Sequence, residues 1–298
     1  MTVPATTLAD VFAQHQHERP GAPLLLAPET GRQHTYGALG ADVAALDALL
    51  TAQGIGAGAH VGFLLPNGLA TSALFLATMI AGRVTVPLNL LSQAPQLAYV
   101  LAHSEVRCVF VSGEQAATLA AAVALLPTTG GATPGIAVVN IDVDEPLASQ
   151  LPPLTGTAKT AAPQANDPAL LMYTSGTTGK PKGALLTHAN LLHAARTVAA
   201  WHRLTPADRV LSSLPLYHIN GQCIATLSPF VSGGSIVTPH RFSASAWWGW
   251  VDAWQPTWIN VVPTIIAYLL NAAAEGDAPA PARPFIRFAR SASAPLPP

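Results

Sequence analysis

Short apolar runs alternate with longer helical stretches through the first half of the chain. The strand-like runs cover residues 61–65, 84–88, 106–111 and 136–141, and the helical stretches cover residues 69–81, 93–103 and 115–126. This alternation is typical of βαβ units, whose strands lie parallel. Further strand-like runs at residues 210–214, 235–238, 257–261 and 285–290 continue it. The pattern therefore predicts an α/β protein with a largely parallel sheet.

Composition indicates how large the core must be. Half of the 298 residues are apolar and only 10% are charged, which predicts a sizeable core in one large domain or two subdomains. Tryptophans at 247, 248, 250, 254 and 258 are spaced as on a helix, and we expect core packing rather than an aromatic cage. Residues 144–167, rich in Pro, Ala and Thr, read as a surface connection.

Residues 173–183, Tyr-Thr-Ser-Gly-Thr-Thr-Gly-Lys-Pro-Lys-Gly, have the composition of a polyphosphate-binding loop. Gly176 and Gly179 free the backbone to curl with its N–H groups inward. Two of the three lysines of the chain, Lys180 and Lys182, lie here and supply mobile positive charge. Short hydroxyl donors come from Thr174, Ser175, Thr177 and Thr178.

The setting of this loop supports a binding role over the alternative of a flexible hairpin. Its spacing differs from the common phosphate loop Gly-x-x-x-x-Gly-Lys-Ser/Thr, which argues against a GTPase or ATPase of that class. Apolar runs at residues 169–173 and 184–186 flank it, and Thr187 is a good N-cap for a helix over residues 188–202.

Several blocks in order resemble the adenylate-forming superfamily, which includes acyl-CoA synthetases. They are the loop at residues 173–183 and the segments at residues 35–39, 79–82, 86–89, 214–218 and 291–296. The resemblance spans essentially the whole chain and implies stacked αβαβα subdomains. One subdomain would comprise residues about 61–214, and the second residues 1–60 plus 215–298.

The resemblance implies a two-step ligation that uses ATP, Mg²⁺ and coenzyme A. An acid is first converted to an acyl-adenylate, and a thiol then displaces AMP. The segment from Thr174 to Lys182 would hold the β and γ phosphates, while Ser293, Ala294 and Pro295 would contact the nucleotide. Lys180, Lys182 and His218 are the predicted catalytic residues, and no protein residue is predicted as a metal ligand.

Residues 214–222 bear on the substrate. They contain no aspartate of the kind that binds the amino group of an amino acid in related peptide-synthetase domains, so a small-molecule carboxylic acid without an α-amine, fatty or otherwise, is favoured. The resemblance places Tyr217, His218, Asn220, Gly221 and Pro263 at the acyl pocket. A neutral structural histidine remains the alternative for His218.

The resemblance also implies features that this chain does not contain. They are a Tyr-Gly-x-Thr-Glu block, a ribose-binding aspartate, and a small mobile domain with a catalytic lysine. We therefore expect residues 1–298 to be an incomplete N-terminal adenylation domain. Two hypotheses follow: an acyl-CoA synthetase whose catalysis needs the remainder, and a fragment that binds a nucleotide or an acyl ligand without turnover.

Other features narrow the partners. A net charge of −1 gives no reason to expect nucleic acid, and the longest apolar stretch, residues 69–82, is too short to span a membrane. The spacing of Cys108 and Cys223 suits reduced thiols in a cytoplasm. Association into a homo-oligomer is left open.

Overall fold

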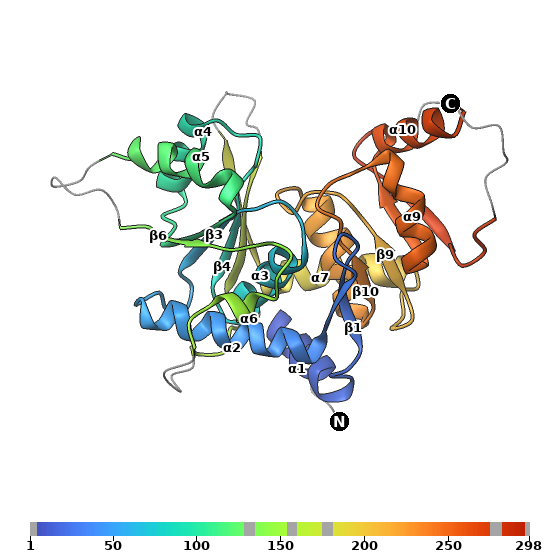
Figure 1. The fold of residues 1–298 in the computed structure, drawn as a ribbon. Helices are drawn as coiled ribbons and strands as arrows, with labels where there is room; N and C mark the ends of the chain where they lie inside the picture. Colours follow the sequence, from blue (N-terminus) through green and yellow to red (C-terminus); the bar gives the residue numbers. More distant parts are fainter. Residues whose placement is uncertain (1–4, 128–134, 154–159, 175–180, 275–281, 296–298) are drawn as a thin grey trace.

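The computed structural model describes residues 5–127, 135–153, 160–174, 181–274 and 282–295, and its strands form two six-stranded sheets (Figure 1). One sheet has the order β12-β11-β9-β10-β1-β2 and the other β6-β5-β3-β4-β7-β8. The first contains β1 (Pro23–Ala27), β2 (Arg32–Thr35), β9 (Arg209–Leu211), β10 (Ser235–Val237), β11 (Trp258–Val261) and β12 (Phe288–Ser291). The second contains β3 (His60–Leu64), β4 (Val84–Pro87), β5 (Cys108–Val111), β6 (Ala137–Asn140), β7 (Pro168–Thr174) and β8 (Lys182–Thr187).

Most neighbouring strands are parallel, as the sequence predicted. The exceptions are the antiparallel pairs β1–β2 and β7–β8. The first sheet takes strands from both ends of the chain, because β1 pairs with β10 more than 200 residues later.

The helices complete five layers. Helices α4 (Ala94–His103) and α5 (Gly113–Ala124) pack on the outer face of the second sheet, and α9 (Ala244–Trp254) and α10 (Pro263–Ala274) on the outer face of the first. Between the sheets lie α1 (Leu8–Glu18), α2 (Tyr36–Ala52), α3 (Leu69–Ile80), α7 (His188–Trp201) and α8 (Ser228–Ser232). The short helix α6 (Leu147–Gln150) packs on α2 and α3. The predicted αβαβα stacking is confirmed.

Helix α3 is the centre of the fold. Every one of its residues is buried, and it contacts β4 of one sheet and β1 of the other. A helix that is apolar on all sides is stable only inside a core, and here the core cluster joins residues from both sheets. The two sheets therefore share one central core.

Some boundaries differ from the predicted ones for local reasons. The block at residues 35–39 is itself the start of α2, because the Thr35 hydroxyl accepts a hydrogen bond from the Ala38 N–H at 3.1 Å. Strand β12 begins three residues later than predicted, since the Ile286 N–H bonds to the Arg283 carbonyl in a turn. Trp247 and Trp258 are fully buried, and the other three tryptophans pack against the same core or its edge, as expected.

Candidate functional site

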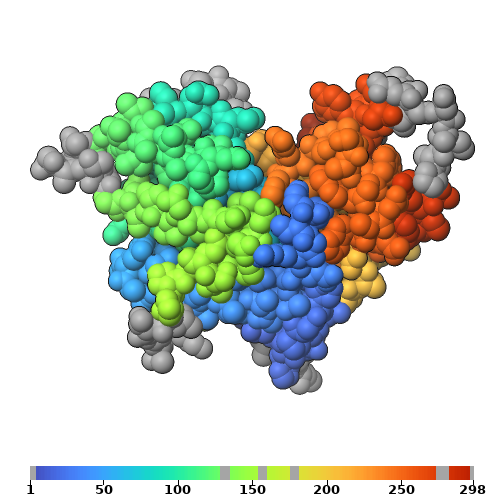
Figure 2. All heavy atoms as spheres, viewed as in Figure 1, coloured from blue at the N-terminus to red at the C-terminus, as the bar shows by residue number. Residues whose placement is uncertain are grey.

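A cleft of about 710 Å³ lies at the carboxyl ends of strands from both sheets. Figure 2 shows a notch between the part that carries α4 and α5 and the part that carries α9 and α10. In open parallel sheets, ligands bind outside the carboxyl ends of the strands. The lining is contributed by Pro87, Leu88, Asn89, Ser92, Gln96, Leu97, Val100, Met172, Tyr173, Thr174, Pro181, Leu214, Pro215, Tyr217, His218, Ile219, Asn220, Val262 and Ser293.

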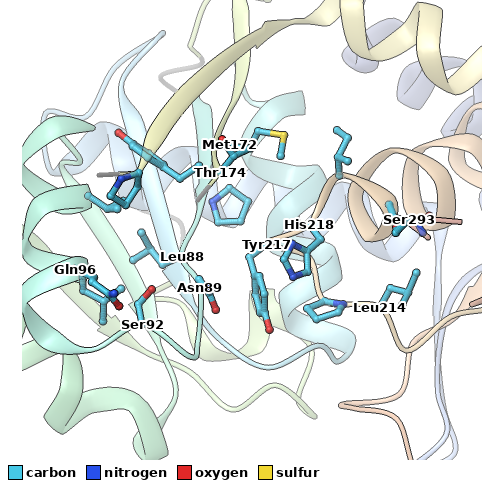
Figure 3. Close-up of a pocket in the computed structure, with 18 of the residues that line it drawn as sticks. Leu88, Asn89, Ser92, Gln96, Met172, Thr174, Leu214, Tyr217, His218 and Ser293 are labelled. Atoms are coloured by element: carbon cyan, nitrogen blue, oxygen red, sulfur yellow. The ribbon is translucent and has the colours of Figure 1, made fainter. Parts of the chain in front are cut away.

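Tyr217 and His218, which the sequence predicted at the acyl pocket, lie side by side in this cleft (Figure 3). Their ring centroids are 4.6 Å apart and the rings are inclined at 59°. Burial lowers the pKa of His218 and raises the pKa of Tyr217. Both side chains are therefore neutral near pH 7, and each presents hydrogen-bonding groups without a net charge.

The loop that carries these two residues is held from the opposite sheet by Asn67, which follows β3. The Asn67 Nδ2 group donates to the Leu214 carbonyl at 3.0 Å, and its Oδ1 accepts from the Leu216 N–H at 3.2 Å. Asn67 is only 5% exposed. Because one side chain satisfies a buried donor and a buried acceptor of the loop, it fixes the loop against the second sheet.

A π-helix, η1 (Asn220–Leu227), begins directly after this loop. Gly221 lies in its first turn, where a Cβ would come within 2.5 Å of the Pro215 carbonyl oxygen. Gly221 is absent from the cleft lining, so the structure places this predicted pocket residue in the packing beneath the pocket. The absence of a side chain there allows the close approach of the two backbone segments.

Asn220 lines the cleft and is also bonded away from it. Its Oδ1 accepts from Asn260 Nδ2 at 3.1 Å and from Arg290 Nη1 at 3.2 Å, and Arg290 Nη1 also donates to Asn260 Oδ1 at 3.2 Å. Asn260, on β11, is fully buried. The resemblance placed Asn220 at the pocket, whereas no sequence motif assigned a role to Asn260 or Arg290.

The described residues on either side of the glycine- and lysine-rich loop lie at the cleft. Strands β7 and β8 form an antiparallel hairpin in which Thr174 is opposite Lys182, and both Thr174 and Pro181 line the cleft. Lys182 is exposed and is not part of the lining. The predicted phosphate-binding residues Ser175, Gly176, Thr177, Thr178, Gly179 and Lys180 lie outside the described residues.

The remaining predicted contacts lie at the ends of β11 and β12. Ser293 lines the cleft with a positive φ of 78°, whereas Ala294 and Pro295 are exposed and outside the lining. Pro263 begins α10 and is also outside it, although its neighbour Val262 is a lining residue.

Four polar residues of the lining were not predicted as site residues: Asn89, Ser92 and Gln96 (Figure 3), and Tyr173. Asn89 Oδ1 accepts from the Leu91 N–H at 2.9 Å, which shapes the turn after β4. The only available signal was that Asn89 ends the block at residues 86–89. The hydroxyl of Tyr173 lies 2.7 Å from His103 Nδ1.

The described residues include no cluster of three or more His, Cys, Asp or Glu side chains that could hold a metal ion. Within the same ranges, no helix is both long and apolar enough to cross a membrane.

The fold and the cleft define an α/β protein with a ligand site where the carboxyl ends of two mostly parallel sheets meet. The chain belongs to the AMP-binding enzyme family, whose model matches residues 12–298. The resemblance read from the sequence is thereby confirmed.

Among curated proteins, the chain is 48% identical to the sulfoacetate–CoA ligase of Cupriavidus necator, over 98% of this chain and 55% of that protein. It is 30% identical to the oxalate–CoA ligase of Arabidopsis thaliana, over 84% of this chain and 48% of that protein. The chain thus spans about half the length of the curated relatives it matches.

Solved structures agree on the fold. The inhibitor-bound N-terminal domain of FACL13 from Mycobacterium tuberculosis matches with a TM-score of 0.82 and 25% identity, over 98% of this chain and 71% of that one. ATP-bound MatB from Rhodopseudomonas palustris matches with a TM-score of 0.79 and 27% identity, over 97% of this chain and 55% of that one.

Proposed function

We propose that the protein containing this chain activates a carboxylic acid with ATP and transfers the acyl group to coenzyme A. The observation that carries this proposal is the cleft, whose lining includes Thr174 and Pro181 at the two ends of the glycine- and lysine-rich loop together with Tyr217 and His218. Membership of the AMP-binding enzyme family supports it, and so do the relatives, which are named CoA ligases.

The proposed first step needs no general base. A carboxylic acid with a pKa near 4 is already ionised at neutral pH, so its oxygen attacks the α-phosphorus of ATP directly while the bond to pyrophosphate breaks. In the second step the sulfur of coenzyme A attacks the acyl carbon, the bond to AMP breaks, and the thiol proton passes to water. The protein's part is to align the reactants and to stabilise the charge that develops on phosphate.

His218 and Tyr217 are proposed to position the acid. A neutral imidazole beside the carboxylate can donate one hydrogen bond. It forms no ion pair, which would stabilise the bound carboxylate more than the transition state and so slow the reaction. The lowered pKa of His218, caused by burial, supports this neutral role. The fixed loop geometry, with the His218 N–H bonded to the Pro215 carbonyl at 3.1 Å, supports a rigid wall.

ATP is proposed to lie across the hairpin end. Thr174, Lys182 and residues 175–180 would contact the β and γ phosphates, and Ser293 with residues 294–295 would contact the nucleotide. The positive charge of lysine and the backbone N–H groups of such a loop can both bind the negatively charged phosphates of ATP. Mg²⁺ is proposed on the resemblance alone, because the described residues offer no ligand cluster for it, and no step here is assigned to it.

The wider parts of the account are also proposals. We propose that residues about 61–214 form one subdomain and residues 1–60 plus 215–298 the other. A substrate without an α-amine is supported by the absence of an acid in residues 214–222. A cytoplasmic location is supported by Cys108 and Cys223, which are both buried and unpaired.

The test is thioester formation by the complete protein. With ATP, coenzyme A and a panel of carboxylic acids, we expect an acyl-CoA and AMP in equal amounts by mass spectrometry. The Lys180→Ala plus Lys182→Ala double variant removes two phosphate-directed charges, and we expect its rate to fall at least about 100-fold. The single variant Arg107→Ala, on the surface turn before β5, is the matched control for loss of positive charge. Unchanged pyrophosphate exchange in the double variant would refute the phosphate assignment.

A further inference from the structure

Arg290 is the one arginine whose side chain hydrogen-bonds to the cleft lining in the described part of the chain. It lies on β12, three residues before the lining residue Ser293, and its Nη1 meets Asn220. The guanidinium is thus in contact with a lining residue, although Arg290 is not itself part of the lining.

The partners of Arg290 are all neutral. Its two hydrogen bonds go to the amide oxygens of Asn220 and Asn260, and no carboxylate of the described residues lies within ion-pair distance. Arg287, which directly precedes β12, is different, because it pairs with Asp208. Arg290 therefore keeps a charge that the described protein leaves without a counter-charge.

The surroundings of Arg290 also favour an incoming anion. Burial lowers the pKa of Arg290, which reflects a guanidinium taken partly out of water. Its Nε and Nη2 have no hydrogen-bond partner among the described residues, so two donors of the guanidinium fork remain for a planar or tetrahedral oxyanion.

A second polar group without a partner in the described structure lies on Asn220, the residue to which Arg290 donates. Asn220 is only 8% exposed, and its Nδ2 is buried without a partner among the described residues. Buried amide donors are nearly always satisfied in native proteins. A bound oxyanion beside Asn220 would satisfy this donor together with those of Arg290.

We propose that Arg290, held by Asn220 and Asn260, binds a second anionic group at the far end of the acid substrate. This inference rests on the proposed function, because it assigns the reacting carboxylate to His218. His218 and Asn220 are two residues apart, so their Cα atoms are separated by at most about 7 Å. The substrate class is accordingly a short acid with a carboxylate or sulfonate opposite the reacting carboxylate.

The test compares charged acids with neutral analogues of the same size in acid-dependent ATP–pyrophosphate exchange. Sulfoacetate is paired with methylsulfonylacetate, and malonate with monomethyl malonate. In the wild-type protein we expect kcat/KM to favour at least one charged acid over its partner by about 100-fold, the scale for losing a charge-assisted contact. The pair with the larger ratio shows whether sulfonate or carboxylate is bound.

The variants assign that preference to Arg290. In Arg290→Gln we expect the charged acid to lose about 100-fold while its neutral partner is unchanged, and Arg290→Lys to restore part of the preference. The matched control Arg287→Gln, directly before the same strand, should keep the preference. A wild type that prefers neutral acids, or an Arg290→Gln variant that loses all acids equally, would overturn the proposal.

A failure of the proposed function gives a different result. If no acid supports exchange in the wild type, ligation is wrong, and the anion subsite is then tested by thermal shift with sulfoacetate and malonate. Stabilisation that is present in the wild type and absent in Arg290→Gln supports the subsite. No stabilisation in the wild type contradicts it.

Discussion

The hydrogen bonds of Asn67 lead to a prediction about both the stability of the protein and the binding of the acid. Asn67→Ala removes the bonds to the Leu214 carbonyl and the Leu216 N–H, at 3.0 and 3.2 Å, from a site where all three residues are less than 10% exposed. A buried polar group left without a partner costs about 1–3 kcal/mol. Because the cavity admits some relaxation or water, we expect the free energy of unfolding to fall by about 2–4 kcal/mol.

Urea unfolding followed by tryptophan fluorescence measures this loss, with Asn140→Ala as the matched control. Asn140 is an exposed asparagine at the end of β6 in the same sheet, and we expect its replacement to change stability by less than about 0.5 kcal/mol. Asn67→Asp is a second variant, since it keeps the acceptor for Leu216 but turns a carboxylate oxygen toward the Leu214 carbonyl.

The same change has a functional consequence. Without these bonds the loop should no longer hold Tyr217 and His218 in fixed positions. We therefore expect the KM for the acid to rise by about tenfold, equivalent to 1.4 kcal/mol, and the KM for ATP to change less. If Asn67→Ala unfolds within about 0.5 kcal/mol of the wild type and keeps the KM for the acid, the reasoning that this side chain fixes the loop is wrong.

Three further predictions concern packing and pH. Gly221→Ala places a Cβ 2.5 Å from a backbone carbonyl oxygen, so we expect a loss of about 1–3 kcal/mol in urea unfolding; an unchanged midpoint would contradict this. Arg83 is fully buried and paired with Asp47, so Arg83→Met should cost about 3–5 kcal/mol, and a variant as stable as the wild type would show that the pair is dispensable. Burial lowers the pKa of His15 and His188, so the unfolded state binds more protons below about pH 6.5 and Tm should fall as pH decreases through that range; a Tm that rises there would give the opposite sign.

The fold was largely predictable because its strands and helices follow local patterns. The runs at residues 61–65 and 84–88 became β3 and β4 almost unchanged, and the helix expected at residues 188–202 became α7 with Thr187 as its N-cap. The α1 helix and the β1–β2 hairpin were not predicted. Strands β1 and β2 are only five and four residues long, whereas α1 carries a local signal in the capping box of Thr7 and Asp10 that was not used. Strand β9 ends at Leu211, three residues before the predicted end, and beyond it the Leu214 carbonyl accepts from the side chain of Asn67, which follows β3.

The candidate site was predictable only where a motif marks it. The predicted site residues Tyr217, His218, Asn220, Ser293 and Thr174 all line the cleft, and their contacts with ligands stay predictions. The roles of more distant partners could not be read from sequence, because they depend on contacts across the fold. Asn67 lies 147 residues from Leu214, and Arg290 lies 70 residues from Asn220. No local sequence pattern predicts such long-range contacts.

Gly221 shows a second limit of sequence reasoning. A glycine inside a pocket motif suits a ligand that approaches the backbone, and it equally suits a close backbone contact within the protein. The π-helix that brings it against the preceding turn is rare and has no reliable sequence signature. In the structure Gly221 makes the close backbone contact and is absent from the cleft lining.

The most direct test of the central claim is acid-dependent exchange of labelled pyrophosphate into ATP by the complete protein. If the cleft forms an acyl-adenylate, exchange is absent without an acid, appears when a suitable acid is added, and does not require coenzyme A. Exchange that appears without any acid, or ATP binding without exchange for every acid tested, would contradict the account and favour a nucleotide-binding role without turnover.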